Sequence, residues 1–144
     1  MAMTACSSNP SSKQIDSMLK RIDVVERQVK TLYNQDFNYL VDEYKALDTT
    51  IAMTKDIKQE MELLQAYLQQ FENQRVIINK AAEYSRKQLS DLQSDVKKHL
   101  YDEKTTSKYI QDEEAELCMM EAQIKYFQEK FDAQKKVVKQ LRKE

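Results

Sequence analysis

Apolar residues recur every three or four positions over three long stretches of the chain, running from Ile15 to Leu47, from Ile57 to Val96 and from Ile110 to Leu141. The apolar positions of the first stretch are Ile15, Met18 or Leu19, Ile22, Val25, Val29, Leu32 or Tyr33, Phe37, Leu40, Tyr44 and Leu47. This spacing places one apolar stripe on each of three amphipathic helices. We therefore predict helices over about residues 12–47, 54–100 and 107–142.

Two polar stretches separate the three helices. The first, DTTIAMTKD (48–56), is rich in Thr and Asp, whose side chains compete for backbone hydrogen bonds. We predict a turn between Asp48 and Thr54, with Thr54 or Asp56 near the next N-cap. A continuous helix with an interrupted heptad pattern is the alternative.

The other two helix starts are predicted from capping residues. Ser11 and Gln14 have the spacing of a capping box, so the first helix is expected to begin near Ser12. In YDEKTTS (101–107), Thr106 or Ser107 is the expected cap of the third helix.

The three stripes also predict how the helices pack. If neighbouring helices run antiparallel about residues 50–51 and 104–105, large apolar residues face small ones. The predicted fold class is all-α, an elongated, staggered, up-down-up three-helix bundle with antiparallel coiled-coil packing. The same register places Glu26, Arg75 and Gln134 in one buried polar layer that fixes the alignment of the helices. We expect one domain, residues 12–144, preceded by a flexible tether, residues 1–11.

The composition agrees with long helices and few tight turns. The 144 residues include no Gly and one Pro, whereas an average chain of this length has about 10 Gly. Glycine permits the turns of β-hairpins and phosphate-binding loops, so these structures are excluded. The 23 basic and 24 acidic residues nearly cancel, and no nucleic-acid partner is expected. No stretch approaches the roughly 20 apolar residues that span a bilayer.

The residues that could carry chemistry have simpler structural interpretations. His99 is the single histidine and lies near a helix end, where it is expected to interact with the helix dipole. Cys118 adjoins an apolar position and is expected to pack. Asp112, Glu113, Glu114 and Glu116 are expected to place negative charge in the first turns of the third helix. We therefore predict no enzyme activity, no metal site and no cofactor.

The C-terminus is the main basic surface of the sequence. Its cationic residues are Lys135, Lys136, Lys139, Arg142 and Lys143. They form a candidate surface for an anionic partner, although basic residues in a last helical turn also simply complement the helix dipole.

The N-terminal segment contains a candidate lipid-attachment site. Met3-Thr4-Ala5-Cys6 has the residue sizes of a bacterial lipobox, in which small residues precede the cysteine that receives the lipid, and a Ser-, Asn- and Pro-containing segment follows it. The basic and apolar parts of a signal peptide do not precede Cys6 here, so attachment is expected only in a longer gene product. The alternative is an ordinary disordered start with an unmodified thiol.

Together, Cys6, the polar segment and the three helices resemble small coiled-coil lipoproteins of the bacterial envelope, including those of the cell-wall-binding type. The resemblance implies a lipid on Cys6 and a body outside the cytoplasm. We therefore predict a non-enzymatic envelope lipoprotein that acts as a helical spacer or as a binding surface for a protein or cell-wall partner. The alternative is a cytoplasmic coiled-coil adaptor that docks partner helices. A homodimer is a separate expectation, because the staggered arrangement leaves the apolar residues near 57–64 and 89–100 covered by one helix each.

Overall fold

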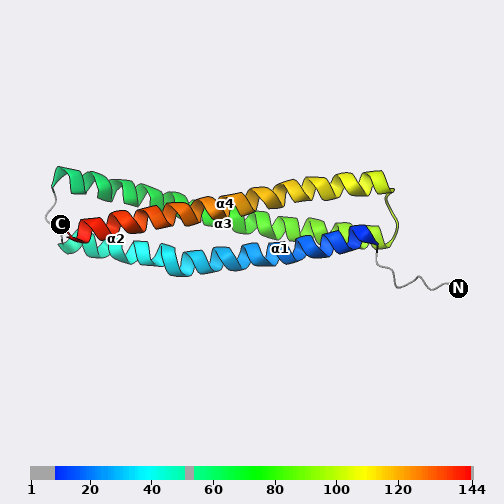
Figure 1. Ribbon diagram of the computed structural model, residues 1–144, viewed down its shortest axis with the longest axis horizontal. Coiled ribbons are helices and arrows are strands. Elements are labelled where there is room, and N and C mark those ends of the chain that lie inside the picture. Colours follow the sequence, from blue (N-terminus) through cyan, green and yellow to red (C-terminus); the bar gives the residue numbers. More distant parts are fainter. Residues whose placement is uncertain (1–8, 51–53, 144) are drawn as a thin grey trace. The chain divides into compact units, whose positions relative to one another are not determined.

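The computed structural model describes residues 9–50 and 54–143, and every regular element in these two ranges is helical (Figure 1). In chain order the elements are α1 (Pro10–Leu32), the π-helical segment η2 (Tyr33–Phe37), α2 (Asn38–Thr50), α3 (Lys55–Lys97) and α4 (Glu103–Lys143). Over the described residues the protein is therefore all-α, as the apolar spacing predicts.

The first helix begins two residues before the predicted start near Ser12. Asn9 caps it, because the Asn9 Oδ1 accepts a hydrogen bond of 2.9 Å from the Ser11 N–H. Pro10 occupies the first helical position, where its missing N–H leaves no partner unsatisfied. An Asn-Pro start therefore replaces the predicted capping box.

A single π-helical turn at Tyr33–Phe37 interrupts the first helix, which the sequence predicts as continuous to residue 47. Leu32 and Tyr33 are adjacent, yet both are buried, at 5% and 1% exposure. Adjacent residues of a regular α-helix point in different directions, and the wider π turn re-aims the chain so that both side chains reach the core.

The start of α3 agrees with the sequence. The Thr54 Oγ1 accepts a hydrogen bond of 3.3 Å from the Ile57 N–H, so Thr54 is the N-cap as predicted. The choice between a turn and a helix irregularity before Thr54 depends on residues 51–53, which lie outside the described residues.

The loop between the last two long helices lies earlier than predicted, because α3 ends at Lys97 and α4 begins at Glu103. His99 has a φ of 56°, in the left-handed region. The His99 N–H donates to the Val96 carbonyl and the Leu100 N–H to the Asp95 carbonyl, each at 3.1 Å. These two bonds form a Schellman motif, a helix stop that usually has glycine where this chain has His99.

Asp102 caps α4, in place of the predicted Thr106 or Ser107. Its Oδ1 accepts a hydrogen bond of 2.7 Å from the Thr105 N–H. The pKa of Asp102 lies below its ordinary value mainly because of a hydrogen bond from the Thr105 side chain, and the bond from the Thr105 N–H lowers it further. Because Asp102 caps the helix, α4 starts four residues before the predicted position 107.

The described residues form two compact units. Unit 1 contains residues 9–26 and 80–122, and unit 2 contains residues 27–50, 54–79 and 123–143. The predicted apolar positions supply both cores. The largest fully buried side chains of unit 1 are Ile15, Met18, Ile22, Leu89 and Leu117, and those of unit 2 are Tyr33, Leu40, Leu47, Leu64, Phe71, Ile78 and Phe131.

Candidate functional site

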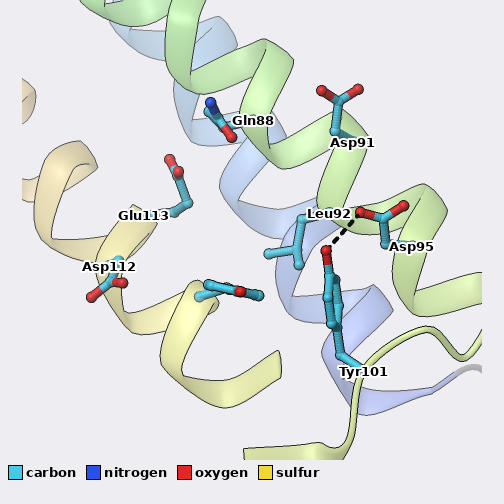
Figure 2. Close-up of a pocket in the computed structure, with 8 residues that line it drawn as sticks. Gln88, Asp91, Leu92, Asp95, Tyr101, Asp112 and Glu113 are labelled. Carbon is cyan, nitrogen blue, oxygen red and sulfur yellow. Dashed lines mark hydrogen bonds between the residues drawn. The ribbon is translucent and has the colours of Figure 1, made fainter. Parts of the chain in front are cut away.

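Unit 1 contains a pocket of about 200 Å³ between the last turns of α3 and the first turns of α4 (Figure 2). Four carboxylates and two tyrosine rings line it, together with an amide and a leucine. The lining residues are Gln88, Asp91, Leu92, Asp95, Tyr101, Tyr109, Asp112 and Glu113. We call this hollow the acidic pocket.

The two tyrosines of the acidic pocket form one wall. Their ring centroids lie 5.1 Å apart in an edge-to-face arrangement with an interplanar angle of 74°. The Tyr101 hydroxyl donates a hydrogen bond of 3.3 Å to the Asp95 carboxylate, drawn as a dashed line in Figure 2. The negative charge of Asp95 is the main cause of the raised pKa of Tyr101.

Glu113 projects from α4 into the space between the helices (Figure 2). Partial burial is the main cause of its raised pKa, and the charges of Glu116 and Asp112 raise it further. The predicted role of the acidic run needs correction, because α4 starts at Glu103 and the run therefore lies more than two turns inside the helix. These carboxylates do not supply charge to the first turn.

The chemistry of the acidic pocket favours a cation and disfavours an anion. The carboxylates supply negative charge, and the faces of tyrosine rings attract cationic groups. In the part of the chain that the structure describes, no group of three or more His, Cys, Asp or Glu side chains is arranged to hold a metal ion.

A second polar cluster in unit 1 centres on Arg21. The Arg21 guanidinium donates to both carboxylate oxygens of Glu114 at 2.7 Å and to Glu121 at 2.5 and 3.2 Å. These bonds raise the pKa of Arg21 and lower that of Glu114. Sequence reasoning did not identify this cluster. Glu114 and Glu121 are seven residues apart and share one helix face, which is a usable signal.

The sequence predicts one buried polar layer of Glu26, Arg75 and Gln134, but in the structure Glu26 and Arg75 have other partners. Glu26 accepts a hydrogen bond of 2.9 Å from Arg86, whereas Arg75 pairs with Glu72 on its own helix. All three side chains are half-buried rather than buried. The correction follows from the helix breaks, because the predicted register assumes different turn positions and no π turn.

In unit 2 the aromatic side chains form the centre of the core. Phe71 meets Phe131 edge-to-face with ring centroids 4.5 Å apart, and the Tyr33 hydroxyl donates a hydrogen bond of 2.6 Å to the Phe71 carbonyl. The Arg75 guanidinium lies over the Tyr33 ring at 5.3 Å. Arg75 therefore covers one side of an aromatic cluster that includes Tyr33 and Phe131.

The predicted basic surface is partly used within unit 2. Lys135 pairs with Asp36, and the Arg142 Nε contacts the Glu43 Oε2. The other three residues, Lys136, Lys139 and Lys143, are exposed on α4.

Of the two cysteines, only Cys118 belongs to the part of the chain that the structure describes. Cys6, the predicted lipid-attachment residue, lies outside the described residues. Cys118 is exposed, so its predicted packing role is wrong. Its thiol lies 3.6 Å from a Glu114 carboxylate oxygen and 3.8 Å from the Arg21 guanidinium.

Comparisons with models of protein families, with curated proteins and with solved structures give no match. Among the helices of the described ranges, none has both the length and the apolar content needed to cross a bilayer.

Proposed function

We propose that this chain is the body of a non-enzymatic envelope lipoprotein, attached to the membrane through a lipid on Cys6. In this role it acts as a helical spacer or as a binding surface for a protein or cell-wall partner. The observation that carries the proposal is the position of Cys6 in Met3-Thr4-Ala5-Cys6, only three residues before Asn9 and Pro10 start α1. A lipid at Cys6 would be joined almost directly to a helical body.

We also propose the antiparallel arrangement of the helices. Within unit 1, Asp16 pairs with Gln93 and Asp23 with Arg86, so residue numbers rise along α1 as they fall along α3. Within unit 2, the contact of Phe71 with Phe131 suits a pairing of α3 and α4 centred on residues 98–102. The two pairs of unit 1 support an antiparallel course of α1 and α3, in a register different from the predicted one.

Metabolic labelling with a fatty-acid probe tests the attachment. The full-length gene product is expressed in a bacterium with the probe, and the wild type is compared with Cys6→Ala. The matched control is Cys118→Ala, because Cys118 is the other cysteine of the chain and its side chain is exposed. We expect label on the wild type and on Cys118→Ala, and none on Cys6→Ala. Label that survives Cys6→Ala, or an unlabelled wild type, contradicts the proposal.

One observation favours the alternative, a cytoplasmic adaptor for partner helices. In unit 2, α3 exposes Leu63, Val76 and Ile77, at 50%, 47% and 52% of their surface. Exposed apolar residues on one helix can serve a partner helix. The same labelling experiment separates the two functions, since an adaptor in the cytoplasm receives no lipid at Cys6.

A further inference from the structure

The loop between α3 and α4, residues 98–102, lies where the N-terminal segment enters the helical body. One hollow of unit 1 is lined both by Asn9 and Pro10 and by His99 and Tyr101. The start of α1 and this loop therefore share one end of the unit. Cys6 is four residues before Pro10, and four extended residues span at most about 14 Å.

The loop exposes an apolar side chain that its own backbone motif would usually cover. Leu100 follows the left-handed residue of the Schellman motif, a position whose side chain commonly packs on the last turn of the helix. Here that turn presents Ser94 and Asp95, which are polar. Leu100 consequently remains 59% exposed, and the neighbouring Tyr101 is 39% exposed.

The groups around Leu100 suit the boundary between water and lipid. Tyr101 combines an aromatic ring with a hydroxyl that hydrogen-bonds to Asp95, and tyrosine is enriched at membrane interfaces for this reason. Lys97, Lys98 and Lys104 are exposed beside the loop. Their long side chains can bury the methylene groups and keep the ammonium at the phosphate level.

We propose that the 98–102 loop contacts the bilayer that holds the lipid on Cys6, with Leu100 and the ring of Tyr101 inserted among the phospholipid headgroups. The inference rests on the proposed attachment at Cys6. The headgroup layer is about 5–7 Å thick on each side of the hydrocarbon, so a body joined to its lipid by four residues keeps this loop within reach of it. The carboxylates of the acidic pocket stay in water and limit insertion to the tip of the loop.

Tryptophan fluorescence on tethered protein tests this contact, because the chain contains no Trp. In a Cys118→Ser background, Cys6 is coupled to a maleimide lipid in phosphatidylcholine–phosphatidylglycerol vesicles. Leu100→Trp reports on the loop. Met119→Trp is the matched control, since Met119 is 61% exposed and lies sixteen residues into α4, about 24 Å along the helix.

On vesicles that contain brominated lipid, we expect Leu100→Trp to lose fluorescence and to shift to shorter wavelength, and Met119→Trp to do neither. Circular dichroism of both variants checks that the helices are intact. An unquenched Leu100→Trp on protein that floats with the vesicles overturns the proposal. So does equal quenching of both variants, and so does a blue shift of Leu100→Trp without quenching, because that result assigns the loop to a protein contact.

The vesicle experiment is independent of lipid attachment in cells, because the chemical coupling supplies the anchor. A failed fatty-acid labelling would remove the native anchor and leave the vesicle result unchanged. A failed quenching experiment would remove the loop contact and leave the anchor.

Discussion

His99 carries a backbone conformation that its side chain disfavours, so glycine at this position is expected to stabilise the protein. The φ of His99 is 56°, and for a residue with a Cβ the left-handed conformation costs about 1–2 kcal/mol. Glycine adopts it freely but loses about 0.5–1 kcal/mol of additional backbone entropy on folding. The difference between the central values predicts that His99→Gly raises the free energy of unfolding by about 0.75 kcal/mol.

Chemical denaturation followed by circular dichroism measures this effect. At 144 residues, a gain of this size corresponds to a rise of about 2 °C in the melting temperature. Lys98→Gly is the control, because the Lys98 N–H still makes a helical bond of 3.1 Å to the Ser94 carbonyl. There, glycine should destabilise by about 0.5–1 kcal/mol.

A substitution series sharpens the interpretation. His99→Asn should lie between the wild type and His99→Gly, since asparagine tolerates the left-handed region better than most residues. His99→Ala should gain nothing, because alanine retains the Cβ. If His99→Gly is no more stable than the wild type while Lys98→Gly is destabilised, then strain at His99 is not what limits the end of α3.

Two further substitutions test the polar groups of the two units. Tyr33→Phe in unit 2 removes the hydrogen bond to the Phe71 carbonyl and should lower the free energy of unfolding by about 1 kcal/mol; an unchanged denaturation midpoint would show that this bond contributes nothing. In unit 1 the folded protein raises the pKa of Glu113 above its ordinary value of 4.5, so the folded state binds the proton more tightly and stability is lost as the pH rises through the folded pKa. Glu113→Gln should therefore be more stable than the wild type at about pH 7 and lose that advantage near pH 4; melting curves at the two pH values check this, and an advantage that grows on acidification would contradict it.

The positions of the helices follow from local sequence and were largely predictable. The start of α3 at Thr54 depends on a hydroxyl three residues before the Ile57 N–H, and both residues are visible in the chain. The end of α3 lies three residues before the predicted position 100, and the start of α4 lies four residues before the predicted position 107. The reason is that the chain has no glycine to mark the stop, and the left-handed residue is a histidine.

The acidic pocket could not be predicted from the sequence, because its position depends on the same unrecognised helix stop at His99. The sequence predicts that Asp112 and Glu113 lie in the first turns of a helix, and it predicts no role for Asp91 and Asp95. Once α3 stops at Lys97 and Asp102 starts α4, the last turns of one helix and the first turns of the next lie on either side of a five-residue loop. Side chains about twenty positions apart then share one hollow.

The sequence by itself determined that this protein is helical and which residues are buried, because an apolar repeat of three and four positions is a local property of each helix. Only the tertiary structure decided the partners of the polar residues. Glu26 binds Arg86, and Arg75 lies over Tyr33. If one helix shifts by one turn along its neighbour, its apolar stripe still faces the core, but each of its charged side chains meets a different partner. Apolar burial is tolerant of such shifts, and a salt bridge is not.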